Sequence, residues 1–544
     1  MNSFPAQPAK PAASGLSRRS LLRRGGIGAA GAGIFGLGAL PTAASAQQDD
    51  RDGSQNVVLV VLPLVRQDHV DAFEGGSPAD TPNLNDLTGD SLRFDRTVPE
   101  SMPGLSARRA LITGMRAYPF RDWRRTDGLA PVPGFTPIWD HQPVLTETLR
   151  EHGVTTAYVS DNPTLTGARW PDVKTTGATA RSPSTGQPGI ESELLPAIAR
   201  QTKAAARTFR AGIRELRGLG GETPFFLAID PFDPLDAAVA PRVYVRPGEV
   251  EEEGIGPLNG RMVELNWSGA DEERVRNAYR KHVEAVDAEI GRLMDALSEL
   301  DLLDSTLVVA IGDQGISLGE HAMLGIAAPT SYRPAYEVPF LIRHPGGDKG
   351  GDDIDWYATT HDVAPTILSF MGATIPGKVG GEDLTALFDD VDEDDLYDRP
   401  FNITAVGSNI IVQDDRWLMV ADREEIERRM YDDDEEVEDD IKRYDDIANE
   451  DPGQLTEMSL VALMVAGGTL PEFGPDGALR PARQRGDDDI DDDGIPNDFD
   501  AINNDEPEDG TEPGDFEFDG RIPEGGRLPL NERTPESAPP EASP

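Results

Sequence analysis

Polar and charged side chains follow two apolar segments of this chain, at the points where those segments end. Arg66, Asp68 and His69 come after the first long run of Val and Leu. Asp313 and Gln314 come after a second run of the same kind. Such runs, without polar alternation, are typical of strands buried on both faces of a parallel sheet. Because ligands of open α/β sheets bind beyond the carboxyl ends of the strands, these side chains are candidates for a metal or anion site.

A loop that leads into a short helix is a second candidate feature. Pro103 and Gly104 oppose helix formation, whereas Ser106–Ile112 favours it. Backbone N–H groups at the start of a helix attract anions, and Arg108 and Arg109 add positive charge. The alternative is a surface loop with solvated arginines.

The acidic segment Asp487–Asp500, which reads DDDIDDDGIPNDFD, has the ligand spacing of a calcium loop. Oxygen-bearing side chains occupy loop positions one, three, five, nine and twelve, which are Asp489, Asp491, Asp493, Asn497 and Asp500. Gly494 lies at the sixth position, where the loop turns sharply. The segment resembles a thrombospondin type 3 repeat, and calcium is the ion that we expect there. The alternative is a disordered acidic tail that fits the pattern by chance.

Alternating strand and helix patterns position these residues. The pattern predicts strands at Thr155–Ser160, Phe225–Asp230, Thr306–Ile311 and Val338–Arg343, and helices at Val144–His152, Pro196–Leu219, Asp271–Leu300 and His361–Met371. The clearest helix is Asp271–Leu300, whose apolar residues recur at three- and four-residue spacing. This alternation predicts a doubly wound α/β sheet.

Several segments, taken in order, resemble the sulfatases of the alkaline phosphatase superfamily. Pro63–His69 has the frame of the family's Asp-x-x-Arg-x-Asp-His, and Gly104–Gly114 has that of Cys/Ser/Thr-x-Pro-x-Arg followed by Leu-Thr-Gly. Phe225–Pro234 and Ile311–His321 are similar to Phe-Asp-Pro-His and to Ser-Asp-His-Gly…Leu-Gly-Glu-His. The resemblance implies a doubly wound mixed sheet of alkaline phosphatase type with a smaller C-terminal sheet subdomain.

The resemblance also implies roles for individual residues. Gly104 falls at the position of the nucleophile, Arg108 and His321 at positions beside the transferring group, and Asp68, Asp313 and Gln314 at positions near the metal. In the family's chemistry a divalent cation polarises the ester and activates the nucleophile, while an arginine offsets charge on the group being transferred.

The sequence departs from the family pattern at several of these positions. The replaced positions are Pro63 for the first metal Asp, Gly104 for the nucleophile, Gln314 for the His of Asp-His-Gly, Leu235 for a His, and Ile326 for a Lys. Hard divalent cations need several oxygen ligands, so we expect a poor site for the family metal.

The sequence therefore favours a sulfatase-like protein with an impaired or absent hydrolase activity, which binds a sulfated or phosphorylated ligand through Arg108 and its neighbours. One alternative is an active sulfuric or phosphoric ester hydrolase with a rearranged site, using Ser101 or Ser106 and a metal held by Asp313, Gln314 and Asp68. Another is a calcium-stabilised binding protein of the cell envelope that uses the fold only as a scaffold.

Composition limits the partners. The 98 acidic residues against 50 basic ones give a net charge of −48, which disfavours nucleic acid because phosphate binding needs a basic face. The chain has no cysteine, which excludes disulfides, thiolate nucleophiles and cysteine-ligated zinc.

The N-terminal segment has the features of a twin-arginine export signal. Ser17–Leu22 carries the two arginines, Gly25–Leu40 is a weakly apolar run, and Ala44–Ala46 fits the small-residue cleavage pattern. We expect a periplasmic, cell-envelope or extracellular location, with no stable membrane span after cleavage. The expected organisation is a signal peptide at 1–46, a sulfatase-like domain at 55–375, a smaller subdomain with an acidic insert at 376–460, a calcium loop at 485–502 and a disordered tail at 503–544.

Overall fold

The computed structural model describes most of the chain between residues 55 and 471. The described residues are 55–74, 77–102, 104–123, 138, 142–161, 173–175, 190–219, 224–232, 269–318, 324–325, 333–347, 350–377, 379–388, 399–407, 409–414, 416–421, 429–432, 451–468 and 470–471. All of them belong to one compact unit of the chain, Gly53–Asn504. The predicted export signal, calcium loop and C-terminal tail lie outside the described residues.

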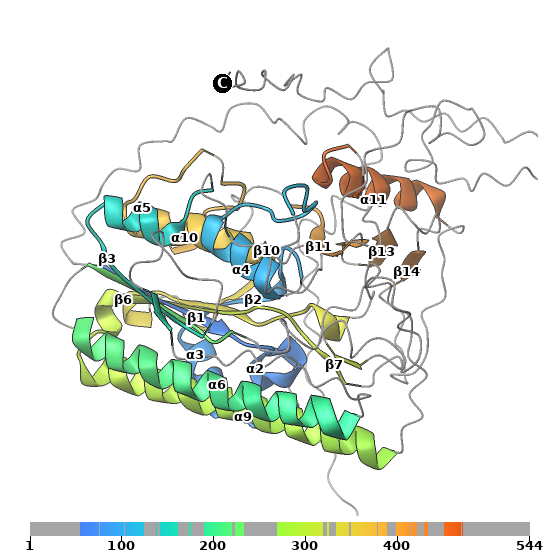
Figure 1. Ribbon diagram of the computed structural model, residues 1–544. Helices are drawn as coiled ribbons and strands as arrows, with labels where there is room; N and C mark the ends of the chain where they lie inside the picture. The colour runs from blue at the N-terminus through green and yellow to red at the C-terminus, as the bar shows by residue number, and fades with distance from the viewer. Residues whose placement is uncertain are drawn as a thin grey trace, which may run out of the picture. The chain divides into compact units, whose positions relative to one another are not determined.

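A large mixed sheet organises this unit (Figure 1). Its eight strands follow the order β10 (Asp353–Thr359), β2 (Leu92–Val98), β9 (Phe340–Arg343), β6 (Thr306–Gly312), β1 (Asn56–Leu62), β5 (Phe225–Asp230), β3 (Thr155–Ser160) and β4 (Val173–Thr175). Neighbouring strands are parallel except at β9, which runs antiparallel to both β2 and β6. The predicted doubly wound mixed sheet is therefore confirmed.

Strand β1 lies in the middle of the sheet because all seven of its residues are apolar or can be buried between neighbouring strands. Successive side chains of a strand point to opposite faces. Val58, Val60 and Leu62 join one core with helices of one face, whereas Val57, Leu59 and Val61 join the core of the other face. Both faces of the sheet are thus covered, as its unbroken apolar sequence predicts.

The helices form two layers, one on each face of the sheet (Figure 1). One layer contains α4 (Gly104–Thr113), α5 (Leu145–Glu151) and α10 (Val363–Phe370). The other contains α3 (Pro82–Gly89), α6 (Ile190–Leu219) and α9 (Gly269–Glu299). Helix α9 matches the predicted apolar stripe, whereas α6 begins before Pro196, where the sequence had placed its start.

Short elements connect these layers. They are η1 (Gln67–His69), α2 (Asp71–Glu74), η2 (Leu303–Ser305), the two-stranded pair β7 (Ser317–Leu318) and β8 (Leu324–Gly325), η4 (Arg333–Ala335), η5 (Pro345–Gly347), η6 (Thr360–Asp362) and η7 (Leu384–Phe388). Within the described part of the chain, no helix combines the length and the apolar character that crossing a membrane requires.

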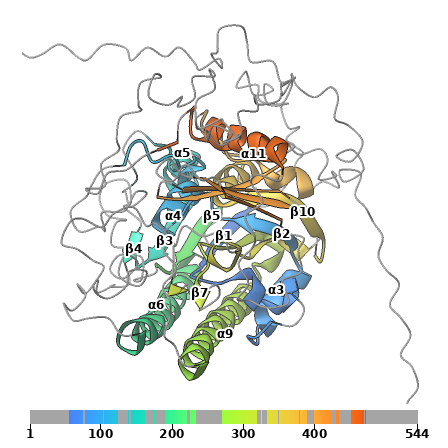
Figure 2. The same cartoon turned by 90° about the vertical axis from the view of Figure 1, so that its right-hand side faces the viewer.

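A smaller antiparallel sheet follows in the sequence (Figure 2). Its strands follow the order β11 (Asn402–Val406), β12 (Asn409–Gln413), β13 (Trp417–Ala421) and β14 (Arg429–Asp432), and α11 (Pro452–Val465) packs on it. Asp451 caps α11 by accepting a hydrogen bond from the backbone N–H of Gln454. The predicted smaller C-terminal sheet is therefore present.

A partly buried ion pair links the segment after β10 to the segment before β11. Arg399, just before β11, donates to both oxygens of Asp362 at 2.8 Å, and its guanidinium lies over the ring of Trp356 at 4.3 Å. Burial acts to raise the pKa of Asp362, but Arg399 and His361 hold it far below its usual value. Asp362 therefore stays charged, and its carboxylate also accepts hydrogen bonds from the backbone N–H groups of Thr359 and Glu382.

Replacing Gly212 with alanine tests the packing of α6 on β5. A β-carbon at position 212 would lie 2.5 Å from side-chain atoms of Ile229, which is fully buried in β5. We expect Gly212→Ala to lower the free energy of unfolding by about 1–3 kcal/mol in a denaturant titration.

Gly218→Ala is the matched control in the same helix. A β-carbon there meets no atom within 4 Å, so we expect unchanged or slightly increased stability. Equal losses in the two variants would contradict the described contact between α6 and β5.

Candidate functional site

The carboxyl ends of three adjacent strands define the candidate site. β1 lies between β5 and β6 and is parallel to both. The Pro63–Arg66 loop, Asp230 and Asp313 therefore meet at one edge of the sheet. Helix α4 begins at Gly104 and brings Arg108 to the same edge. The short sequence-predicted helix at Ser106–Ile112 thus starts two residues earlier, at the position of the predicted nucleophile.

The Arg108 guanidinium forms the centre of the site. Its Nε donates to Oδ1 of Asp230 at 2.7 Å and its Nη1 donates to Oδ2 of Asp313 at 2.8 Å. Its Nη1 and Nη2 also donate to the backbone carbonyls of Gly104 and Pro231, at 3.1 and 2.8 Å. The guanidinium thus lies among four oxygen atoms.

These three charged side chains are buried. Arg108 is 3% exposed, Asp313 is 1% exposed and Asp230 is fully buried, and the guanidinium also lies 5.2 Å from the centre of the Phe232 ring. A buried side chain can remain ionised when an opposite charge and hydrogen bonds offset the cost of removing it from water. Two carboxylates take up the charge of Arg108 in this arrangement, and its binding of an anion stays a prediction from the sequence.

Asp313 is held by groups from three separate parts of the chain. Its Oδ1 accepts hydrogen bonds from the backbone N–H of Leu64 at 2.8 Å and of Gln314 at 2.9 Å, while Oδ2 accepts from Arg108. Burial raises the pKa of Asp313, and the Arg108 guanidinium opposes that rise. Leu64 has a φ of +55°, a left-handed conformation that non-glycine residues seldom adopt, and this conformation directs its N–H to the carboxylate.

The positions that the family resemblance assigns to the nucleophile and to a metal ligand bind each other. The backbone N–H of Gly104 donates to Oε1 of Gln314 at 3.0 Å. Gly104 supplies no side-chain nucleophile, and the amide oxygen of Gln314 is occupied by this N–H. The structure thus brings together Gly104, Arg108, Asp313 and Gln314, as the sequence predicts, but they are bonded to one another.

Asp68 is bonded to its own neighbours in the loop after β1. It accepts hydrogen bonds from Nε and Nη2 of Arg66 and pairs with Nδ1 of His69 at 2.8 Å. Burial acts to raise its pKa, but Arg66 and His69 hold it far below its usual value. Within the described residues, none of its hydrogen bonds joins it to Asp313. His321 lies outside the described residues.

Asp230 is a site residue that the sequence did not single out. Its Oδ2 accepts a hydrogen bond from the Tyr158 hydroxyl at 2.9 Å, and its backbone carbonyl accepts one from Ser160 at 2.7 Å. Burial and the Asp230 carboxylate raise the pKa of Tyr158 well above its usual value, so the hydroxyl remains a donor. The signal in the sequence was an Asp at the end of a wholly apolar strand.

Helix α9 fixes the loop that follows β1. The Tyr279 hydroxyl donates to the carbonyl of Leu64 at 2.6 Å and accepts from the N–H of Arg66 at 2.9 Å. Nε2 of His282 lies 2.8 Å from the carbonyl of Pro63, and its Nδ1 lies 3.1 Å from the hydroxyl of Thr202. Burial lowers the pKa of His282 to about 4, so the ring is neutral and donates from Nε2.

The residues at this edge of the sheet do not fit the divalent cation that the fold family implies. Pro63 offers no side-chain oxygen, and the facing oxygens of Asp230 and Asp313 are both bonded to Arg108. Among the described residues, no group of three or more His, Asp or Glu side chains is arranged to hold a metal ion.

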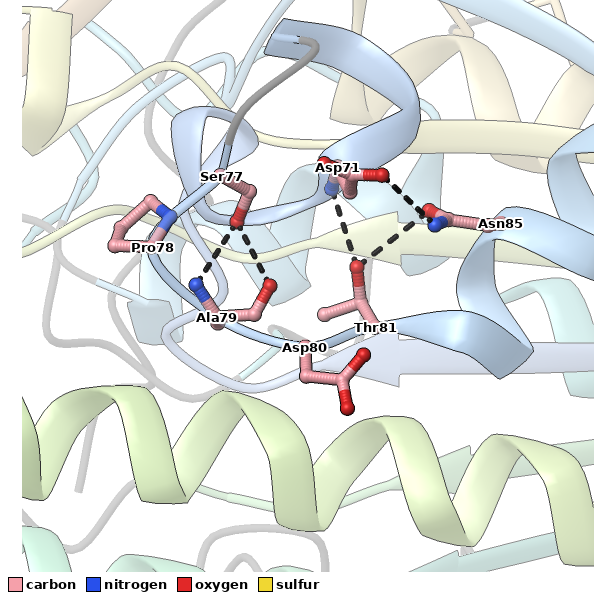
Figure 3. Close-up of a pocket in the computed structure, with 7 residues that line it drawn as sticks. All are labelled: Asp71, Ser77, Pro78, Ala79, Asp80, Thr81 and Asn85. Atoms are coloured by element: carbon pink, nitrogen blue, oxygen red, sulfur yellow. Dashed lines mark hydrogen bonds between the residues drawn. The ribbon is translucent and has the colours of Figure 1, made fainter.

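A separate polar pocket of about 320 Å³ lies between α2 and α3 (Figure 3). Its polar groups bond to one another: Thr81 accepts from the N–H of Asp71, and Asn85 donates to the Asp71 carboxylate. None of the residues around Arg108 lines this pocket, so it is not part of the candidate site.

Comparisons with known proteins show what this chain is similar to. A family model described as Sulfatase matches residues 202–373. N-acetylglucosamine-6-O-sulfatase of Bacteroides thetaiotaomicron is 33% identical over 129 residues, which are 24% of this chain and 22% of that protein. The multifunctional alkaline phosphatase superfamily protein PehA of Trinickia caryophylli is 24% identical over 457 residues, covering 68% of this chain and 86% of that protein. The chain is thus similar to proteins of the sulfatase family and of the alkaline phosphatase superfamily.

Solved structures agree in fold. The phosphonate monoester hydrolase of Agrobacterium radiobacter has a TM-score of 0.55 at 17% identity, covering 78% of this chain and 100% of that chain. The 2-O GAG sulfatase BT1596 has a TM-score of 0.57 at 16% identity, covering 76% of this chain and 91% of that chain. The similarity to the first curated relatives is local, because the matched segments span only 22% of their length.

The buried His282 ring makes stability depend on pH. Its folded pKa of about 4 lies below the ordinary value of 6.5, so the unfolded chain binds more protons between these values. The stabilisation is complete above pH 6.5 and is lost as the pH falls towards 4. We expect His282 to contribute a decrease of about 3 kcal/mol in the free energy of unfolding over this interval, measured by denaturant titration at each pH.

The variant His282→Gln keeps an amide donor for the carbonyl of Pro63 but does not titrate, so its stability should depend less on pH. His152→Gln, at an exposed position, is the control and should keep the wild-type pH dependence. If His282→Gln shows the same slope as wild type, then His282 is not the buried neutral ring described above.

Proposed function

We propose that this chain is an exported sulfatase-family protein that does not hydrolyse sulfate or phosphate esters at the family site. One observation carries the proposal: the groups at the family's nucleophile, arginine and metal positions are bonded to one another. Gly104 binds Gln314, and Arg108 binds Asp313. No group at these positions is left to attack sulfur or phosphorus.

The expected loss of rate is large. Covalent catalysis needs a nucleophile. A preorganised cation is also needed to stabilise the negative charge on the transferring group. Gly104 offers no nucleophilic atom, and the positive charge of Arg108 is already shared between Asp230 and Asp313. Enzymes owe rate enhancements of about a millionfold or more to such groups acting together, so losing both should bring ester hydrolysis close to the uncatalysed rate.

The rival proposal is an active hydrolase with a different nucleophile. Ser101 donates to Oε2 of Glu100 at 2.7 Å, and burial raises the pKa of that carboxyl. A serine beside a carboxylate is a recognisable arrangement for proton transfer. Both side chains are fully buried, however, as is Ser106, so a substrate could reach none of them without a rearrangement.

Family members act on sulfate esters, and a sulfated or phosphorylated molecule is the class of ligand that we propose for this protein. Arg108 is not its anchor, because its guanidinium is buried between carboxylates. Arg109 is paired with Asp122 and is equally unsuited. The binding of calcium to the loop at Asp489–Asp500 stays a prediction from the sequence.

Export by the twin-arginine route is part of the proposal, and replacing Arg18 and Arg19 together with lysine tests it. We expect the double-lysine variant to accumulate in the cytoplasm as a longer, uncleaved chain, whereas wild type appears outside the cytoplasm at the length of the processed form. Cell fractionation and mass spectrometry of the N-terminus measure both properties. Replacing Arg23 and Arg24 with lysine is the control, which should leave export unchanged. Equal export of the double-lysine variant and wild type would contradict this part of the proposal.

Activity measurements on the exported protein test the central part. Aryl sulfates, phosphate monoesters and phosphate diesters, each with manganese, magnesium or calcium added, should give no turnover above the protein-free background. Asp313→Asn and Ser101→Ala should give the same background. Metal-dependent turnover that is lost in Asp313→Asn would overturn the proposal, and turnover lost in Ser101→Ala would establish the rival hydrolase.

A further inference from the structure

We propose that a row of basic side chains on the outer face of α6 binds the acidic run Asp487–Asp493 of the same chain, which lies outside the described residues. The basic row consists of Lys203, Arg207, Arg210, Arg214 and Arg217. Helix α6 belongs to the helix layer on one face of the large sheet (Figure 1). None of these residues belongs to the candidate site, so the inference does not depend on whether the protein hydrolyses esters.

Helical spacing places the five side chains of the basic row on one face of α6. They recur at intervals of four, three, four and three residues, and at about 100° per residue they fall within an arc of about 80°. All five are exposed, whereas Phe209, Ile213 and Leu216 point to the other side and join the core. From Lys203 to Arg217 the row extends over about 21 Å, at about 1.5 Å per residue.

Much of the positive charge of the basic row is not neutralised by described residues. Two of its members pair with glutamates of α9, at 3.5 and 3.1 Å. The other three, Lys203, Arg207 and Arg214, form no ion pair with any residue that the structure describes. Like charges three or four residues apart destabilise a helix, and α9 avoids this by pairing Lys281 with Glu284. The row is therefore unfavourable unless negative charge from elsewhere neutralises it.

The surroundings of the basic row favour a narrow anionic chain over a membrane or a nucleic acid. Among the described residues, the exposed large apolar side chains are Ile375 and Met464, and neither lies on α6, so the row lacks an apolar neighbour that would enter a bilayer. The one aromatic residue of α6, Phe209, is fully buried and offers no ring for a base to stack on. Four of the five side chains are arginines, whose planar donors suit carboxylates.

The acidic run Asp487–Asp493 matches the basic row in charge and in length. It consists of six aspartates and Ile490. Seven residues of extended chain span about 20 Å, at about 3.3 Å per step, which is close to the length of the row. The net charge of −48 repels dissolved polyanions, whereas a segment of the same chain is present at a high effective concentration.

The position of the run along the chain gives it a long reach. Sixteen residues separate Asp487 from Pro471, the last described residue, and about 3.3 Å per residue allows a span of up to about 53 Å. The other dense acidic run, at 433–440, is held at both ends, by β14 and by α11. These elements belong to the smaller sheet, whereas α6 packs mainly on α9, β5 and β3. The run with one described attachment is therefore the occupant that we assign.

Zero-length cross-linking of the full chain with a carbodiimide tests the inference, because this reagent joins a lysine amine to a carboxylate in contact with it. Lys203 is one of only seven lysines in the chain. A chelator is added because the run overlaps the predicted calcium loop. At about 50 mM salt we expect peptide mass spectrometry to find Lys203 joined to Asp487–Asp493, and about 0.5 M salt should reduce this product about fivefold.

Arg207→Gln combined with Arg214→Gln is the test variant. It removes two positive charges that have no described ion pair and keeps the reactive amine of Lys203, so the product should fall about fivefold at low salt. Arg280→Gln combined with Arg333→Gln is the matched control. These two arginines lie outside the row and pair with nearby glutamates, so their loss should leave the product unchanged.

Lys281 provides an internal standard for the reaction. It pairs with Glu284 one turn further along α9, so the cross-link between these two residues should form equally in wild type and in both variants. Equal yields of this standard show that the fold and the reagent are intact. If the test variant loses the standard, the wild-type product and its response to salt decide the question alone.

Several results would overturn the inference. They are an absent Lys203 product while the standard forms, a product mainly with residues 433–440, and equal products in the test variant and the control. Mixed-isotope products from a mixture of ¹⁵N-labelled and unlabelled chains would place the run of another copy on the row. Retention of wild type on dextran sulfate, without the Lys203 product, would assign the row to an external polyanion. Ester hydrolysis by wild type would overturn the proposed function and leave this inference intact.

Discussion

The ion pairs of Arg108 with Asp230 and Asp313 are the interaction on which the arrangement of this site depends. They join helix α4 to the ends of β5 and β6, and all three side chains are almost completely buried. A buried ion pair stabilises a fold only when its geometry is good and the remaining donors and acceptors are satisfied. Here the two backbone carbonyls and the Phe232 ring meet the guanidinium as well.

Residues that differ from the family's catalytic and metal-binding residues form hydrogen bonds with one another or with nearby groups. Pro63 contributes only its backbone carbonyl, and that carbonyl lies against His282 of α9. The next residue, Leu64, turns its N–H to Asp313, while Gln314 accepts from the N–H of Gly104. Among the described residues, the groups at the positions of Pro63, Gly104, Asp313 and Gln314 are thus bonded within the chain. A sulfatase-like fold thus surrounds a set of polar groups that are bonded to one another.

The sequence predicted the fold well because its strands are wholly apolar and its long helices have regular stripes. Thr155–Ser160 and Phe225–Asp230 are strands with the predicted bounds, whereas α6 begins at Ile190, so Pro196 lies inside the helix and not at its start. The resemblance to the sulfatase motifs also implied that Gly104, Arg108, Asp313 and Gln314 lie together. The role of Asp230 could not be predicted from the sequence. Its partner, Arg108, lies on α4, and the sequence does not show that this helix packs beside the end of β5.

A crystal structure of the exported protein grown in a millimolar excess of manganese, with anomalous scattering recorded at the manganese edge, tests the central claim most directly. We predict no anomalous peak between Asp230 and Asp313, and electron density for the Arg108 guanidinium between the two carboxylates. A manganese peak bound by Asp313, with the Arg108 side chain moved away from it, would contradict the claim that the residues at this edge of the sheet do not fit a divalent cation.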